Sequence, residues 1–188
     1  MKLNLDSGQR KLLETLLFFI KLLIFAIPLY LILIFEGVLL PLQELVSQNV
    51  YHILVFFGLN VVKDGILLVA NGFAFFISED CTGWKSMLFL AALIFAVPKV
   101  EMKKRIAGVV TGIPVIYAGN LARILIVVFI SLNYGYEIAS VIHDYFWQAG
   151  LISLVLILWI LWLLWTGKFK RKRKITFLNY LHKLIKPR

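Results

Sequence analysis

Long apolar runs, separated by short polar segments, are the dominant pattern of this chain. They cover about residues 16–40, 84–98, 106–132 and 145–165. A helix that crosses a membrane needs about 20 apolar residues and at least about 17. The second run is near this minimum if the span begins at Thr82 and slightly below it if the span begins at Trp84. Pro28 predicts a kink in the first run. The pattern predicts an all-α polytopic membrane protein, in which residues 1–188 form a single membrane domain with about four transmembrane helices.

The segment between the first two runs, residues 41–81, has a different pattern. Its first part, residues 41–60, mixes polar and apolar residues and is too interrupted to cross a membrane, which suits an interfacial or re-entrant helix. Asn71-Gly72 then stands between two apolar stretches, and this is the strongest short signal for a β-hairpin. We therefore predict an interfacial helix and a small β-hairpin that lead into Cys81.

The distribution of charge orients these elements relative to the membrane. The chain is 61% hydrophobic and carries a net charge of +10, whereas a soluble domain is about 45–50% apolar. Lysine and arginine gather at the amino terminus, in the loop after Pro98 and in the tail at residues 167–188, while the segments between them carry mostly acids. By the positive-inside rule, both termini face the cytoplasm and residues 41–81 face the outside of the plasma membrane.

The basic tail has two interpretations. It sets the topology and attracts anionic lipid headgroups, or it binds nucleic acid. Because the basic segments alternate with apolar runs, we expect membrane lipid as a partner and no nucleic acid. The first run is too long for the apolar region of a cleaved signal peptide, so we expect it to be retained. We also expect no metal and no other cofactor, since the sequence has neither zinc-ligand spacing nor a phosphate-binding glycine loop.

Two reactive side chains fall at one depth of the predicted bundle. Since an α-helix rises about 1.5 Å per residue, Cys81 lies about 26 Å above the inner boundary at Pro98. The same count from Arg105 places Arg123 at about 27 Å. The hydrocarbon core is about 30 Å thick, so both side chains lie just under the outer interface. His143, at the outer start of the fourth run, falls near the same level.

Cys81 is the single cysteine of the chain. A cysteine at the amino terminus of a helix and close to a cation is favoured as the reactive thiolate. We expect this residue to open the second span, with Lys85, Arg123 and His143 as candidate cations. Gly83 lets another backbone or a substrate approach closely. The alternative is a buried cysteine that acts as a small hydrophobic residue.

Arg123 is unusual because it lies inside an apolar run. An ionisable residue within a span is costly and points to a function. Asn120 precedes it by three residues, so both face the same side of the helix. The guanidinium stays charged and can stabilise a developing oxyanion. Alternatively, Arg123 extends to the outer headgroups or pairs with Glu36.

His143 is the natural general acid and base for a thiol and a leaving amine. Asp144 is adjacent in sequence and is a weak candidate for orienting it, while Asp80 and Gly83, together with Asn120, are supporting residues around the cysteine. The alternative for this histidine is an ordinary interfacial residue.

Together these motifs resemble the core of the exosortase/archaeosortase family. The resemblance spans about residues 65–150 and consists of Cys81-Thr82-Gly83 with Ser86, Asn120-Leu121-Ala122-Arg123, and His143. It implies a membrane cysteine transpeptidase in which Cys81 is the nucleophile, His143 the acid and base, and Arg123 the transition-state stabiliser. Two features depart from the family: one span precedes the site where many members have more, and Thr82 replaces the serine of many bacterial members, which favours the archaeosortase branch.

The resemblance also implies the substrates. They are surface proteins whose carboxy-terminal sorting signal has a short motif, a transmembrane stretch and a basic tail. The enzyme would cleave near the motif and transfer the new terminus to an anchor, a lipid being the expected one.

Two other functions stay open at this point. One is a membrane cysteine peptidase that releases its product to water. The other is a non-enzymatic transporter subunit or assembly scaffold that uses Arg123 as a pairing charge. A chain of four spans without an internal repeat leaves little room for an alternating-access transporter.

Overall fold

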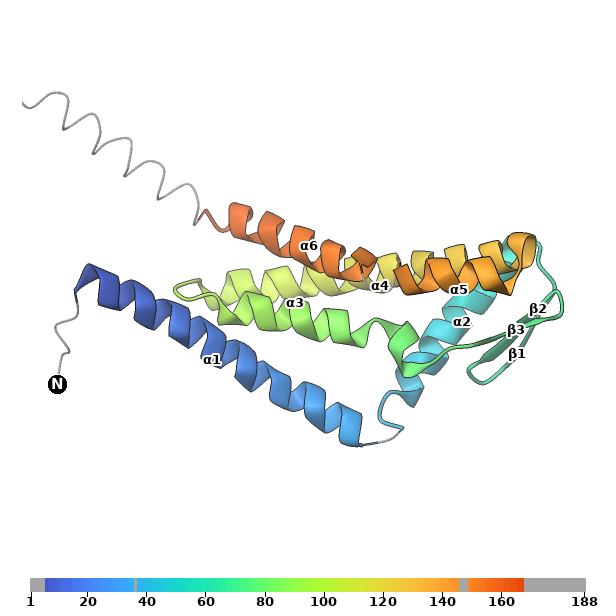
Figure 1. Cartoon of the computed structure of the whole chain (residues 1–188), viewed down its shortest axis with the longest axis horizontal. Helices are drawn as coiled ribbons and strands as arrows, with labels where there is room; N and C mark the ends of the chain where they lie inside the picture. The colour runs from blue at the N-terminus through green and yellow to red at the C-terminus, as the bar shows by residue number, and fades with distance from the viewer. Residues whose placement is uncertain (1–5, 36, 146–148, 168–188) are drawn as a thin grey trace, which may run out of the picture.

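The computed structural model describes residues 6–35, 37–145 and 149–167, which are mostly helical (Figure 1). It has a 3-10 turn, η1 (Glu79–Thr82), and three strands, β1 (Val61–Asp64), β2 (Leu67–Ala70) and β3 (Phe73–Phe76). The helices are α1 (Ser7–Ile34), α2 (Leu40–Phe56), α3 (Trp84–Ala96), α4 (Met102–Tyr134), α5 (Tyr136–Tyr145) and α6 (Leu151–Trp165).

The long helices form an elongated bundle (Figure 1). α3 packs against α1, α4 and α6, while α5 and α6 follow one another along α4 in the opposite direction. α2 and the small sheet lie together at the end of the bundle where α4 finishes. The helix predicted within residues 41–60 is therefore α2, and its interfacial position stays a prediction. The segment before Cys81 forms a structure of its own beside the bundle.

Two described helices, Gly8–Ile32 and Met102–Tyr134, are long and apolar enough to cross a membrane. The apolar helices α3 and α6 are shorter, and the 13 residues of α3 rise only about 20 Å. A helical membrane protein is consistent with these lengths, whereas four crossings stay a prediction.

The bounds of the first and fourth runs differ from the predicted ones. The first helix starts at Ser7 and ends at Ile34, and Leu40 already belongs to α2. The chain breaks between them because Pro41 stands in the first turn of α2, where proline favours the start of a new helix. The fourth run becomes α6, preceded by the separate helix α5, which the sequence analysis did not predict.

The segment after α2 contains two hairpins where one was predicted. The strands form an antiparallel sheet in the order β1-β2-β3. The predicted turn at Asn71-Gly72 joins β2 to β3, and both residues have the positive φ angles, 47° and 86°, that a type I′ turn requires. The additional hairpin turns at Gly65-Ile66, where Gly65 has a φ of 55°.

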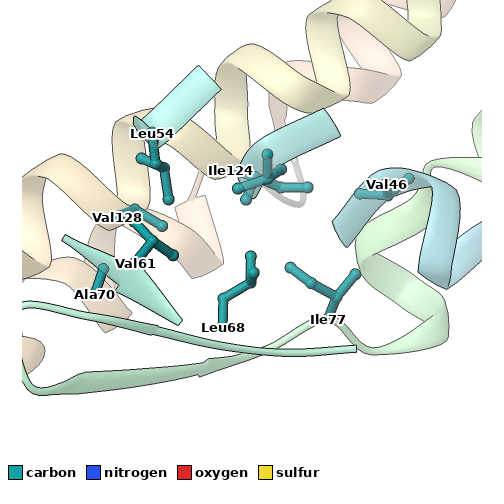
Figure 2. Packing of buried hydrophobic residues seen from close by; sticks show 9 residues of the cluster. Val46, Leu54, Val61, Leu68, Ala70, Ile77, Ile124 and Val128 are labelled. Carbon is teal, nitrogen blue, oxygen red and sulfur yellow. The ribbon is translucent and has the colours of Figure 1, made fainter. Parts of the chain in front are cut away.

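A buried apolar cluster joins the sheet to the bundle (Figure 2). Polar side chains of α2 fasten the same contact, because the Gln43 amide donates to the Ile77 carbonyl at 2.9 Å and the Ser47 hydroxyl donates to the Gly65 carbonyl at 3.0 Å. These contacts fix the end of β3, from which the chain enters η1. The cluster consists of Val46, Val50 and Leu54 of α2, Val61, Leu68, Ala70 and Ile77 of the sheet region, and Ile124 and Val128 of α4.

Gly108 sets the distance between α4 and α6. A Cβ atom at this position would overlap the indole of Trp162, whose Nε1 donates to the Lys104 carbonyl at 2.8 Å. We therefore expect Gly108→Val to force the helices apart and to destabilise the protein by about 1–3 kcal/mol.

The measurement is the thermal unfolding midpoint of the purified protein in detergent. Gly8→Ala in α1 is the control, because a Cβ atom there meets nothing within 4 Å. An unchanged midpoint in Gly108→Val would show that α6 does not pack on α4 at this glycine.

Candidate functional site

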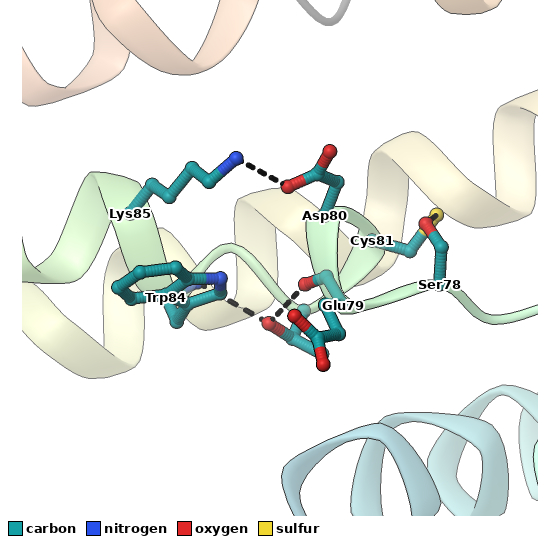
Figure 3. Close-up of polar contacts among 7 residues, drawn as sticks. Ser78, Glu79, Asp80, Cys81, Trp84 and Lys85 are labelled. Carbon is teal, nitrogen blue, oxygen red and sulfur yellow. Dashed lines mark hydrogen bonds and ion pairs between the residues drawn. The ribbon is translucent and has the colours of Figure 1, made fainter. Parts of the chain in front are cut away.

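Cys81 lies in a 3-10 turn of its own (Figure 3). Its backbone N–H donates to the Ser78 carbonyl at 2.9 Å, and the Thr82 hydroxyl donates to the Glu79 carbonyl at 2.7 Å. Gly83 follows with a φ of 76°, a left-handed conformation that glycine adopts at no steric cost. The cysteine was predicted to open α3, but this glycine ends the turn first, and α3 begins only at Trp84.

The thiol of Cys81 is half-buried and accepts a hydrogen bond from the Ser78 hydroxyl, at 3.3 Å. The neighbouring Asp80 carboxylate pairs with the Lys85 ammonium at 2.5 Å (Figure 3). Lys85 was one of the cations expected near the thiol. Its charge instead meets Asp80, because Lys85 is the second residue of α3 and lies next to η1.

Asn120 of α4 fastens this turn to the bundle. Its side chain is wholly buried, and its Nδ2 donates to the Cys81 carbonyl at 2.6 Å. The approach is close because residue 83 is a glycine: a Cβ atom there would lie 3.1–3.4 Å from atoms of the Asn120 side chain. The expected supporting residues Asn120 and Gly83 therefore lie close together, next to the cysteine backbone.

Arg123 lies one helical turn beyond Asn120 and is only 4% exposed. Its guanidinium interacts electrostatically with Cys81 and, less strongly, with Asp80. This burial is contrary to the alternative in which the side chain extends to the outer headgroups. The other alternative, a pair with Glu36, falls on a residue outside the described ones. The equal depths counted along the sequence thus correspond to a lateral contact between Cys81 and Arg123.

A cavity of about 480 Å³ lies beside the cysteine. Its walls come from β3, from the carboxy-terminal half of α4 and from α5, and Cys81 forms part of the lining. The walls are largely apolar, with hydroxyl groups from Ser131, Tyr136 and Ser140. The cavity gives a bound molecule access to the thiol, which a cysteine packed as a small hydrophobic residue does not have.

His143 lies on α5, the helix that forms one wall of this cavity. The side chains of His143 and Asp144 lie outside the described residues. The site therefore brings Cys81, Asn120 and Arg123 together, and the role of the histidine stays a prediction.

Several residues of this region were not predicted. Ser78 contacts the thiol, and its position three residues before Cys81 is the spacing of a 3-10 turn, which was a usable signal. Ser131 and Ser140 line the cavity, but they reach it only because α5 folds back along α4. The packing of α5 along α4 is a tertiary contact, and no short sequence motif predicts it.

A metal centre does not assemble in the described part of the chain, where no three His, Cys, Asp or Glu side chains gather to hold an ion. That no cofactor is needed stays a prediction. The site offers a thiol, a buried guanidinium and a cavity, which is the equipment for nucleophilic chemistry by cysteine.

The fold and the site define a helical membrane protein with a cysteine–arginine pair beside an open cavity. Residues 7–163 match the family model described as Transmembrane exosortase (Exosortase_EpsH), and the chain belongs to this family. The resemblance drawn from the motifs is confirmed at this level, and the archaeosortase branch stays a prediction. Neither a curated protein nor a solved structure matches the chain. Membership makes the chain a membrane protein of a family whose general activity is cysteine transpeptidation in protein sorting.

The bond between Asn120 and the Cys81 carbonyl gives a test of the site. Asn120→Leu removes the donor from a partly buried carbonyl, which costs about 1 kcal/mol. We expect a lower unfolding midpoint and faster alkylation of Cys81 by a maleimide, because the turn is released from α4. The control is Asn133→Leu, since Asn133 is exposed and donates only within its own helix, to the Phe129 carbonyl. Equal effects of the two substitutions would argue against this anchor.

Proposed function

We propose that this protein is a transpeptidase that cleaves the carboxy-terminal sorting signals of surface proteins and transfers them to an anchor through a thioester on Cys81. The observation that carries the proposal is the buried Arg123 guanidinium beside the thiol of Cys81, the residue that lines a cavity. The substrates are proteins that end in a short motif, an apolar stretch and a basic tail. The anchor is a membrane lipid that offers an amine or a hydroxyl.

The proposed topology places this chemistry at the outer face of the plasma membrane. α1, α3, α4 and the α5–α6 pair cross the membrane, and both termini are cytoplasmic. In support, Lys99, Lys103 and Lys104 lie in the α3–α4 loop and at the start of α4, at the end of the bundle opposite to the sheet (Figure 1). The positive-inside rule assigns that end to the cytoplasm.

In the first step, the Cys81 thiolate attacks the carbonyl carbon at the cleavage site. The carbon–sulfur bond forms, and the carbonyl oxygen becomes an oxyanion that the Arg123 guanidinium stabilises. The carbon–nitrogen bond then breaks, and protonated His143 gives its proton to the leaving amine. The products are a thioester on Cys81 and a free amine on the apolar tail of the substrate.

In the second step, the acceptor amine or hydroxyl attacks the thioester, and neutral His143 takes its proton. The carbon–sulfur bond breaks and the thiolate is restored, now with the protonated imidazole present for the next cycle. Asn120 and Gly83 hold the cysteine backbone in place, and Asp144 orients the imidazole. The Asp80 carboxylate also attracts the Arg123 guanidinium. Because Asp80 is paired with Lys85, it competes less with the thiolate and the oxyanion for this guanidinium.

The catalytic roles predict a pattern of losses. Cys81→Ala removes the nucleophile and should abolish processing of a host protein with the three-part tail. Arg123→Ala and His143→Ala should each slow processing by about 100-fold or more. The measurement is the fraction of the substrate in its shortened form, by immunoblot, at matched enzyme levels.

His52→Ala is the matched control for the histidine, because His52 lies on α2 and its ring is bonded to Gln48 on the same helix. It should process like the wild type. Normal processing by Cys81→Ala would end the proposal and favour a non-enzymatic scaffold.

A hydrolytic peptidase uses the same site, with water in place of the anchor. Mass spectrometry of the product's new carboxy terminus separates the two functions. Transfer predicts a terminus joined to the acceptor, and a free acid means hydrolysis.

A further inference from the structure

β3 is an edge strand, because it pairs with β2 on one side and ends the sheet on the other. Ala70 and Phe73 flank a two-residue turn and therefore exchange backbone hydrogen bonds. The next hydrogen-bonded pair across this ladder is Leu68 and Phe75, and the Ile77 N–H continues the alternation by donating to the Ile66 carbonyl at 3.0 Å. The backbone groups of the two residues in between, Ala74 and Phe76, consequently point away from β2.

This open edge faces the cavity that Cys81 lines. Four consecutive residues, Ala74 to Ile77, form one wall of the cavity, and the cysteine lies only a short turn beyond them. Ile124 and Val128 of α4 and Ala139 of α5 line it as well. Within the described part of the chain, the backbone groups of Ala74 and Phe76 have no strand partner, and these two residues border the same space as the thiol.

We propose that the open edge of β3 binds the substrate as an added strand and delivers the cleaved bond to Cys81. This inference rests on the proposed function and adds the binding mode to it. Strand addition at a sheet edge obtains affinity from main-chain hydrogen bonds and specificity from pockets for alternate side chains. Here the backbone partners are Ala74 and Phe76, and the apolar cavity receives side chains of the bound segment.

The direction of the bound segment follows from the shape of the proposed substrate. Its apolar stretch comes after the cleavage motif and enters the membrane, so the residues before the cleaved bond lie outside with the sheet. β3 itself runs from the Asn71-Gly72 turn toward Cys81 and the bundle (Figure 1). The substrate segment before the cleaved bond therefore lies beside β3 and runs parallel to it.

The most direct test changes the substrate and leaves the enzyme intact. Proline is placed at successive positions before the cleavage site of a host surface protein that has the three-part tail. Every second residue of an added strand directs its N–H to the edge it pairs with. We expect processing to fall about tenfold at alternate positions, with smaller losses between them. A uniform loss, or a loss at one motif position only, would overturn the proposal.

A second test changes the edge. Ala74→Pro removes a backbone N–H that points away from β2, toward the proposed substrate strand. Because one hydrogen bond to the substrate is lost, processing should fall by about tenfold. Lys63→Pro is the matched control on the opposite edge: Asp64 and Leu67 flank the other turn, so the Lys63 N–H points away from β2 on the β1 side. This control should process like the wild type.

The rate at which a maleimide alkylates Cys81 without substrate reports the fold of each variant. Support for the proposal is loss of processing in Ala74→Pro with an unchanged alkylation rate. Wild-type processing by Ala74→Pro, or an equal loss in Lys63→Pro, would overturn it while the thioester chemistry stands. If Ala74→Pro changes the alkylation rate, the substitution has altered the fold, and the proline scan of the substrate then supports or overturns the proposal. If the wild type and Cys81→Ala leave the substrate equally unprocessed, the proposed function fails and the strand-addition proposal fails with it.

Discussion

One partly buried hydrogen bond, from the Asn120 amide to the Cys81 carbonyl at 2.6 Å, holds the site to the bundle. Its partners are 39 residues apart in the chain, so the bond attaches the turn η1 to helix α4 of the bundle. It requires that residue 83 have no side chain, because a Cβ atom there would press on Asn120. It also sets the register of α4 beside the turn, and this register brings Arg123 against the thiol one helical turn further on.

A second anchor holds the turn from the other side. The Gln43 amide of α2 binds the Ile77 carbonyl, just before η1, and the apolar cluster under the sheet fixes β3 in place. The cysteine is thus held between α2 and α4, while the cavity stays open along β3. A nucleophile fixed at both ends beside an accessible edge strand suits a substrate that is itself an extended peptide, because neither partner must reorganise to meet the other.

Much of this arrangement was predictable from the sequence, and the remainder has physical reasons. Apolar runs gave the long helices, and a constant rise per residue placed Cys81 and Arg123 at one depth, because helix geometry is nearly independent of tertiary context. Asn71-Gly72 gave a hairpin, since few residues tolerate two positive φ angles in succession. The separate helix α5 and the cavity were not predictable, because they depend on how one helix returns along another. The ion pair between Lys85 and Asp80 was likewise not predictable. It depends on the left-handed backbone conformation of Gly83, which sets the direction of the chain between η1 and α3.

The central claim is that Cys81 carries the substrate as a thioester. The most direct test is mass spectrometry of the enzyme, acid-quenched during processing of a substrate with the three-part tail. The account predicts an adduct on the peptide that contains Cys81, with the mass of the substrate segment before the cleaved bond and lost on treatment with hydroxylamine. Processing that proceeds without this adduct, or with an adduct on another residue, would contradict it.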